Sequence, residues 1–349
     1  MTALASGDVV AEVAGGNEPP ASRGTVRFVL TKIGGGIVSL LLVIVLGFFL
    51  FRILPGDPVK TMTHGQPIGT KQLLALREQL GLDKPLIVQF FDYLGNLLHG
   101  DFGTSYFYNQ PVGQLVLAAL WPTVLLVGTA TIIAVALGLW LGTRSGWRPG
   151  STFDKTSTTI ALTLWSVPQF WLGIILLLVF AQGIGPIPGL FPVQGIFSGN
   201  VAPGFFPHLA DLLHHLVLPC LTLVAAVYAQ YQLIMRSSLI DEMGADYLVT
   251  ARAKGLRDDI VRRRHAVPNA LLPTVTLIFL QLGLVVNGAV AVEVVYSWPG
   301  LGLLMYNALN VPDLPLIQGA FITLAGAVIV MNVLADLVYR LLDPRVRAS

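Results

Sequence analysis

The sequence is poor in charged residues and in cysteine, and each shortage excludes a class of protein. Only 11% of its 349 residues are Asp, Glu, Lys or Arg, whereas 54% are hydrophobic and the mean hydropathy is +0.73. A soluble domain devotes about 25% of its residues to charge, so a soluble globular fold is excluded. The single cysteine, Cys220, excludes an internal disulfide and a cysteine-rich metal site, and its apolar surroundings predict a small buried side chain.

Six apolar segments are long enough to cross a bilayer, which requires about 20 residues of helix. We therefore predict an all-α integral membrane protein with six transmembrane helices. The expected spans are residues 25–54, 112–143, 156–182, 212–236, 265–293 and 314–341. The first is expected to remain as an anchor, because a polar stretch precedes it and no small-residue cleavage site follows it.

The positions of Lys and Arg set the expected orientation, because positively charged loops are retained in the cytoplasm. Sixteen of the 21 basic residues fall near the two termini and in the segments 144–155 and 236–264. The other five are Arg52, at the end of the first predicted span, and Lys60, Lys71, Arg77 and Lys84, in the loop 55–111 that follows it. Both termini are therefore predicted to be cytoplasmic, and the small net charge of +2 gives no indication of nucleic-acid binding.

Three stretches outside the predicted spans have a distinct composition. Residues 1–24 are small and polar, which predicts a disordered cytoplasmic tail. The loop 55–111 is expected to be extracytoplasmic with short amphipathic helices, because Leu73, Leu76 and Leu80 recur at helical spacing and a second apolar stripe follows. Eleven Gly or Pro residues between 183 and 207 predict an irregular external loop.

The loop 241–264 between the fourth and fifth spans is predicted to contain a cytoplasmic helix that does not cross the membrane. Small residues keep this helix slim, and Gly255 can end it in a left-handed cap. A short helix that projects from a membrane bundle suits a groove in a soluble partner. The alternative is that its basic residues only set topology and contact anionic lipid headgroups.

This loop and several other motifs resemble one known family. Tyr247-x-x-Thr-Ala-Arg-Ala-Lys-Gly-Leu256 and His265-Ala-x-x-Asn-Ala-Leu-Leu-Pro273 are similar to the cytoplasmic loop of oligopeptide and dipeptide ABC importer permeases, the B-type subunit of binding-protein-dependent systems. Further matches follow in order: Pro55-Gly-Asp-Pro58, Leu80-Gly-Leu-Asp-x-Pro-Leu86, Gly100-Asp-Phe-Gly-x-Ser105, Pro168-x-Phe170, Glu293-x-Val-Tyr-x-Trp-Pro-Gly-Leu-Gly302 and Leu342-Asp-Pro-Arg345. Together they reach from the first predicted span to the C-terminus.

The resemblance implies a type I ABC importer permease bundle with a cytoplasmic coupling helix, in a bacterial or archaeal plasma membrane. The implied partners are a homologous second permease, two ATPase subunits or domains, an extracytoplasmic solute-binding protein and membrane lipid. The chain itself is expected to be non-catalytic and to bind no cofactor, with ATP and Mg held by the ATPase subunits. Its Gly34-Gly35-Gly36 has no following Gly-Lys-Ser or Gly-Lys-Thr and so does not indicate a phosphate loop.

The resemblance also assigns the ATPase contact to residues of the coupling helix. The family loop usually begins with Glu-Ala-Ala, where this sequence has Val249, Thr250 and Ala251, so Asp246 is the candidate substitute for the missing acid. The expected coupling residues are Asp246, Tyr247, Thr250, Ala251, Arg252, Ala253, Lys254 and Gly255. Arg252 and Lys254 are expected to contact the ATPase, and Ala251 and Gly255 to permit its close approach.

Polar residues inside membrane spans often mark a transport pathway. The candidates for a translocation path are Gln230, Gln232, Gln281, Asn287 and Glu293. The alternative for the amides is hydrogen bonding between helices, and for Glu293 a structural bond to nearby backbone N–H groups.

Other functions remain open from the sequence. A permease of the same family could carry nickel, glutathione or another small solute instead of peptides. A proton-coupled secondary carrier would need an ionisable relay within the spans, and a membrane-bound assembly or receptor subunit would not couple to an ATPase. His208, His214, His215 and Asp211 show no zinc-protease spacing, so no metal site is predicted.

Overall fold

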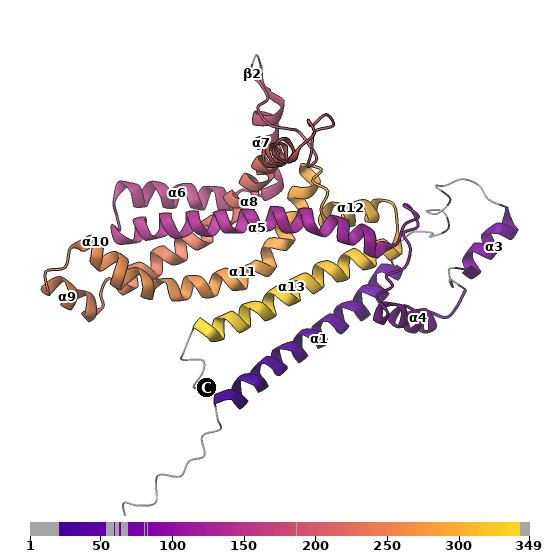
Figure 1. Cartoon of the computed structure of the whole chain (residues 1–349), viewed down its shortest axis with the longest axis horizontal. Helices are drawn as coiled ribbons and strands as arrows, with labels where there is room; N and C mark the ends of the chain where they lie inside the picture. The colour runs from indigo at the N-terminus through magenta and orange to yellow at the C-terminus, as the bar shows by residue number, and fades with distance from the viewer. Residues whose placement is uncertain are drawn as a thin grey trace, which may run out of the picture.

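The protein is described by a computed structural model that covers residues 21–53, 59, 63, 69–79, 81, 83–185 and 187–342, and this part of the chain is almost entirely helical (Figure 1). Most of the predicted tail 1–24 and the motifs at 55–58 and 343–345 lie outside it. The long helices are α1 (Ala21–Ile53), α5 (Val112–Trp147), α8 (Phe205–Glu242), α11 (Val267–Val295) and α13 (Leu314–Leu342). The shorter ones are α3 (Thr70–Gln79), α4 (Leu86–Leu98), α6 (Thr152–Ser166), α7 (Gln169–Leu176), α9 (Asp246–Ala253), α10 (Asp258–Ile260) and α12 (Leu301–Asn310), with π-helical turns η1 (Leu177–Gln182) and η2 (Val261–Ala266).

Helices occupy all six segments that were predicted to span the membrane. Four stretches, Arg27–Arg52, Val112–Trp147, Phe205–Glu242 and Leu314–Leu337, are long and apolar enough to cross it, and α6 with α7 and η1 would make a fifth span. Helix α11 has 29 residues, but the side chains of 279–288 in its middle lie outside the described part. The all-α membrane fold is confirmed, whereas the count of six spans stays a prediction.

The third predicted span is bent. Helix α6 and the α7–η1 segment meet at an angle of 102°. Val167 leaves the helical region, with φ −82° and ψ 128°, because the ring of Pro168 disfavours a helical residue before it and Pro168 has no N–H to continue the ladder. The prediction of one continuous helix over 156–182 was therefore wrong.

Helices α5 and α8 share the most extensive helix–helix contact in the described part of the bundle. They pack closely because α5 presents small residues to α8 at every fourth position. The stripe consists of Ala130, Ala134, Gly138, Gly142 and Gly146. A Cβ atom at Gly142 would lie 2.6 Å from the Gln232 carbonyl oxygen and 2.7 Å from the Met235 Cβ. In a membrane, where apolar contact with lipid competes with apolar contact between helices, such close backbone packing stabilises a helix pair.

Helix α1 lies at the edge of the bundle and packs chiefly against α13 (Figure 1). Lys32 forms an ion pair with Asp336 at 2.8 Å, and a Cβ at Gly47 would lie 3.2 Å from the Phe321 ring. The other face of α1 is apolar and exposed, as at Leu46, which is typical of a surface that lipid covers.

The two short helices predicted within 55–111 are present as α3 and α4. Gly81 follows the end of α3 and has φ +63°, a left-handed conformation typical of a glycine after a helix. On α4, Phe90 packs against Phe48 of α1 with ring centroids 5.3 Å apart, while Phe91 and Leu98 are exposed. Helix α4 therefore packs on the bundle with one face and leaves a second apolar face uncovered.

The segment 183–204 is less irregular than predicted. Strand β1 (Gly183–Ile184) pairs with strand β2 (Ile187–Pro188) in a two-residue antiparallel ladder. The rest of the segment is tied to α8, since Asp211 accepts hydrogen bonds from the Ser198 N–H and hydroxyl at 2.7 Å each. Helix α8 begins at Phe205, seven residues before the predicted start at 212.

Candidate functional site

Helix α9 is the predicted coupling helix, and Gly255 ends it as expected. Gly255 has φ +78°, a left-handed conformation that favours glycine. The Gly255 N–H donates to the Arg252 carbonyl at 2.9 Å, and the Leu256 N–H donates to the Ala251 carbonyl at 3.4 Å. This pair of bonds is a Schellman cap, which satisfies the last carbonyls of a helix.

One face of α9 is buried against the bundle. Leu248 is 0% exposed and Ala251 is 6% exposed. Their cluster includes Trp147 from α5, Met235 and Leu239 from α8, and Ala266 and Ala270 from η2 and α11. The small side chain of Ala251 therefore lets α9 pack closely on the bundle. Ala251 was predicted to let the ATPase approach α9, but its side chain faces the bundle instead.

Tyr247 links α9 to the two long helices on either side of it in the chain. Its hydroxyl donates to Glu242 Oε2 of α8 at 2.5 Å and accepts from Asn269 Nδ2 of α11 at 3.0 Å. Burial, together with the hydrogen bond to Glu242, raises the pKa of Tyr247 above its ordinary value. The hydroxyl therefore keeps its proton and can act as donor and acceptor at neutral pH.

A second link runs from the end of α5 to the segment after α9. The Trp147 indole N–H donates to Asp258 Oδ2 at 2.8 Å. The Arg252 guanidinium lies 5.7 Å from the centre of the Trp147 ring and 3.9 Å from the Asp258 carboxylate. Helix α9 is thus connected to α5, α8 and α11 by both apolar and polar contacts.

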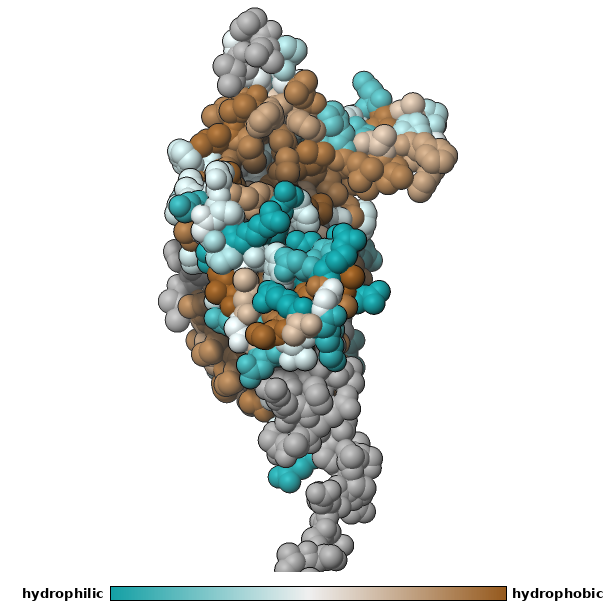
Figure 2. Space-filling model, turned by 90° about the vertical axis from the view of Figure 1, so that its left-hand side faces the viewer, coloured by the Kyte–Doolittle hydropathy of each residue, from teal (hydrophilic) through white to brown (hydrophobic). Residues whose placement is uncertain are grey.

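The remaining face of α9 is exposed. Figure 2 shows the molecule from the end that carries α9 and α10, where hydrophilic side chains gather. The exposed residues are Asp246, Tyr247, Val249, Thr250, Arg252, Ala253, Lys254 and Gly255. Seven of the eight predicted coupling residues therefore lie on an open surface, and Ala251 does not.

Near this end, an ion pair joins α6 to α8 that sequence reasoning missed. Arg236 Nε and Nη2 donate to the two carboxylate oxygens of Asp154 at 2.5 and 2.8 Å. Asp154 also accepts from the Gly150 N–H, and its own N–H donates to the Ser151 hydroxyl. A serine three residues before an acid is a helix-start signal that could have singled out Asp154.

The predicted path residues fall into three groups. Gln232 is fully buried, and neither of its amide atoms has a hydrogen-bond partner among the described residues. Gln230 is half-buried on the same helix, α8. Gln281 and Asn287 lie on α11, but their side chains are outside the described part of the chain.

Glu293 holds the start of α12 in place. Its carboxylate is completely buried and accepts from Thr123 Oγ1 at 2.6 Å, from the Gly302 N–H at 2.7 Å and from the Leu303 N–H at 3.1 Å. The Thr123 hydroxyl in turn accepts from the Leu301 N–H at 2.8 Å. This geometry satisfies the free N–H groups of a helix start and favours the structural alternative over a role in the path.

The glycines that follow Glu293 are part of the same arrangement. A Cβ at Gly300 would collide with the Glu293 carboxylate, and one at Gly302 would lie 2.6 Å from the Val290 Cα atom. Close packing therefore explains why both glycines of the Pro-Gly-Leu-Gly motif carry no side chain.

The three histidines weighed as metal ligands make other contacts. His208 and His215 bond to backbone carbonyls within α8 or just before it, at 2.8 and 2.9 Å, and His214 bonds to the Leu190 carbonyl at 2.8 Å. Among the described residues, no three His, Cys, Asp or Glu side chains are grouped to hold a metal ion.

A bundle of long apolar helices with a short, polar-faced helix fixed at one end defines a multi-span membrane protein of the transporter type. The chain belongs to the family described as "Binding-protein-dependent transport system inner membrane component", which matches residues 134–348, and the corresponding N-terminal family matches residues 25–126. It is a permease subunit, a non-catalytic membrane component, and resembles the peptide and dipeptide ABC importer permeases of this family.

Curated relatives match nearly the whole chain. A protein of Brucella suis biovar 1 named as a peptide permease is 37% identical over 93% of this chain and 99% of its own length. The glutathione transport system permease protein GsiC of Salmonella choleraesuis is 36% identical over 92% of this chain and 99% of its own. The dipeptide transport system permease protein DppB of Escherichia coli K12 is 34% identical over 92% and 98%.

Proposed function

We propose that this permease carries di- and oligopeptides, forms the translocation path with a homologous second permease, and couples to ATPase subunits through α9. In this assignment ATP and Mg are bound by the ATPase subunits, and an extracytoplasmic binding protein delivers the solute. The coupling assignment rests on one observation: α9 packs on the bundle with one face and exposes the other.

The contacts of α9 support its role as a lever. A partner that grips the open face displaces Leu248 and Tyr247, which are packed on or hydrogen-bonded to α8 and α11. Because Trp147 and Asp258 add a link to α5, the displacement passes to three long helices at once. Closure of two ATPase subunits on ATP would then move the bundle, and hydrolysis would reset it.

The names of the relatives support the substrate class. Two of the three proteins compared are named for peptides or dipeptides, and the third is named for glutathione. Peptides are therefore the first candidate and glutathione is the second. The buried amide of Gln232, which has no hydrogen-bond partner within the described part of the chain, is a candidate contact for a peptide backbone once α5 and α8 separate.

Uptake in cells that lack this chain tests the substrate class. The strain is complemented with the wild-type chain and supplied separately with radiolabelled dipeptides, tripeptides and glutathione. We expect restored accumulation of peptides that stops when ATP is depleted and persists with a protonophore at constant ATP. Accumulation of glutathione alone would make glutathione the substrate in place of peptides. Loss of uptake when the protonophore is added at constant ATP would indicate a proton-coupled carrier.

A pair of variants at Gly255 tests the coupling assignment. No atom lies within 4 Å of the position that a Cβ would take at Gly255, so Gly255→Ala and Gly255→Trp carry the same backbone strain and differ in exposed bulk. We expect the indole to abolish ATPase association and uptake, and the methyl group to preserve most of both. If Gly255→Trp leaves association and uptake unchanged, the lever assignment is wrong.

Cysteine labelling tests the proposed orientation, with both termini and α9 in the cytoplasm. In a Cys220→Ala background, Asn200→Cys and Lys254→Cys each place one thiol at an exposed position, on opposite sides of the membrane if the orientation holds. We expect a membrane-impermeant maleimide to label position 200 in intact cells and position 254 only after permeabilisation. The reverse pattern would invert the topology.

A further inference from the structure

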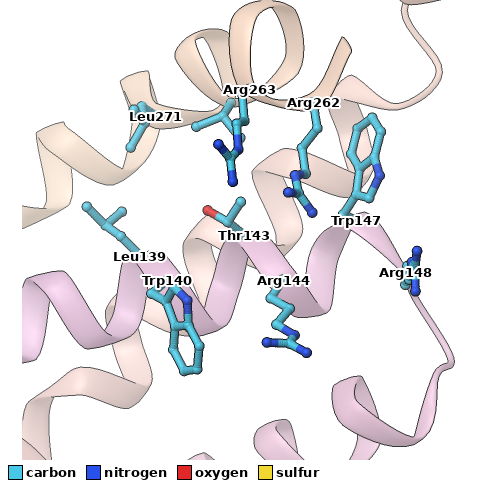
Figure 3. Close-up of a pocket in the computed structure, with 10 residues that line it drawn as sticks. Leu139, Trp140, Thr143, Arg144, Trp147, Arg148, Arg262, Arg263 and Leu271 are labelled. Carbon is cyan, nitrogen blue, oxygen red and sulfur yellow. The ribbon is translucent and has the colours of Figure 1, made fainter. Parts of the chain in front are cut away.

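A cavity of about 700 Å³ lies between the end of α5 and the η2–α11 segment (Figure 3). Four arginines line it: Arg144 and Arg148 from the end of α5, and Arg262 and Arg263 from η2. In Figure 3, Arg262 and Arg263 extend from their helix toward α5. The two pairs are more than a hundred residues apart in the chain, so only the packing of the bundle brings them to one cavity.

The charge of these arginines is not neutralised within the described part of the chain. Neighbouring arginines have carboxylate partners, since Arg236 pairs with Asp154 and Arg257 pairs with Asp259 at 3.3 Å. None of the four cavity arginines has such a partner among the described residues; Arg144 lies over the Phe153 ring at 4.7 Å and over the Trp140 ring at 5.9 Å. In Figure 3, Arg144 extends from the side of α5 opposite to the one that Arg262 and Arg263 approach. Cationic side chains that line one cavity without a carboxylate partner favour an anionic ligand.

The opposite part of the cavity is apolar. It is formed by Leu139 and Trp140 of α5 and by Val267 and Leu271 of α11. Arg144 is the first charged residue of α5, so Leu139 belongs to the apolar run of the span and the arginines begin where that run ends. Tryptophan and arginine are typical of this boundary between hydrocarbon and headgroups. A small soluble anion would use the arginines but not the apolar wall.

We propose that this cavity binds an anionic phospholipid, with its phosphate on the arginines and its acyl chain along the wall of Leu139 and Leu271. Trp147, which also lines the cavity, is the indole that donates to Asp258 and lies beneath Arg252. The bound lipid therefore contacts the side chain that links α5 to the segment after α9.

Native mass spectrometry of the full chain, released from bilayers of equal parts phosphatidylglycerol and phosphatidylcholine with matched acyl chains, tests the proposal. We expect the wild-type chain to retain phosphatidylglycerol selectively. Arg262→Gln/Arg263→Gln should weaken this preference roughly thirtyfold, taking a factor of about five for each basic residue near a membrane surface. The matched control, Arg257→Gln/Arg264→Gln, removes the same charge from the same segment outside the cavity lining and should retain the preference.

A second arginine variant and a competition with phosphate complete the test. Arg144→Gln/Arg148→Gln removes the charge from the other wall and should reduce retention as well, which guards against local misfolding of η2. Inorganic phosphate added at millimolar concentration should not displace the lipid. Equal retention of the two lipids by the wild-type chain, equal loss in both η2-segment variants, or displacement by phosphate alone would overturn the proposal.

Discussion

The two ends of the bundle are held together by different chemistry. At the end that carries α12, two completely buried carboxylates, Glu293 and Asp313, cap the starts of α12 and α13. At the other end, the polar links of α9 itself run through Tyr247 and Arg252, whose side chains are partly exposed, while the buried Asp154 pairs with Arg236 to join α6 to α8 nearby.

The α12 end is fixed because its charges cannot return to water. Asp313 accepts from Ser105 Oγ at 2.5 Å and from the Phe107 N–H at 3.0 Å, so the loop before α5 is attached to α13. Breaking such a contact leaves a buried charge or donor without a partner, which costs several times more than the bond itself contributes. Water can replace the exposed links of the α9 end at little cost, so the α9 end is suited to take more than one position.

The largest effect is expected from Glu293→Ala. It leaves the N–H groups of Gly302 and Leu303 and the Thr123 hydroxyl without their acceptor, and we expect a loss of about 3–5 kcal/mol in unfolding free energy. The measurement is denaturant unfolding of the purified chain in detergent micelles. Asp241→Asn, at an exposed carboxylate of the α9 end, is the control and should change stability by less than about 0.5 kcal/mol. Similar losses in the two variants would remove the distinction between the two ends.

Leu248→Ala should give the next largest effect, because it empties the centre of the cluster beneath α9. We expect a cost of about 2–4 kcal/mol, concentrated in the release of α9, so that hydrogen exchange in 246–253 accelerates while α5 and α8 stay protected. Val249→Ala is the matched control, since Val249 is 58% exposed. Unchanged exchange in Leu248→Ala would show that the buried face does not anchor the helix.

A glycine pair on α5 separates close packing from helix propensity. Gly142→Ala forces a methyl group onto the α8 backbone, and we expect a cost of about 1–3 kcal/mol in denaturant unfolding. At Gly128 a Cβ would meet no atom of the described residues within 4 Å, so Gly128→Ala should be neutral or stabilise the helix by up to about 1 kcal/mol. Equal effects at the two positions would contradict the tight α5–α8 contact.

The smallest effect is expected from Tyr247→Phe, which removes two partly exposed hydrogen bonds at a cost of about 1 kcal/mol or less. Because the folded-state pKa of Tyr247 is raised above its ordinary value of 10.0, its hydroxyl stabilises α9 fully below that pH, and the contribution is lost as pH rises through the raised pKa. Limited proteolysis of the α9 loop should therefore increase at high pH in the wild-type chain more than in Tyr247→Phe. Parallel pH profiles would refute the assigned role of the hydroxyl.

Features set by local physics were predictable from the sequence. The helical segments followed from apolar run length, and the left-handed cap at Gly255 followed from a glycine after a short helix. The bend at Pro168 was missed because the apolar run continues through it, although a proline within a helical pattern is a known boundary signal.

Features set by tertiary packing were not predictable in the same way. For Glu293 the sequence left a path role and a structural bond to backbone N–H groups both open, and the partners that favour the second appear only when α12 folds back over α11. The Pro-Gly-Leu-Gly motif after it was the available signal for a helix start. The inward orientation of Ala251 and the presence of Arg144 and Arg262 at one cavity depend on how α5, α9 and η2 pack, and no spacing in the chain encodes that.

The central claim is that the open face of α9 contacts the ATPase while its other face holds the bundle. Cross-linking in the assembled transporter tests it most directly, with a short photoreactive probe placed at Val249 or at the adjacent Leu248. We expect an efficient cross-link from position 249 to the ATPase subunit and, from position 248, cross-links only within the permease. A cross-link to the ATPase from position 248 with none from position 249 would contradict it.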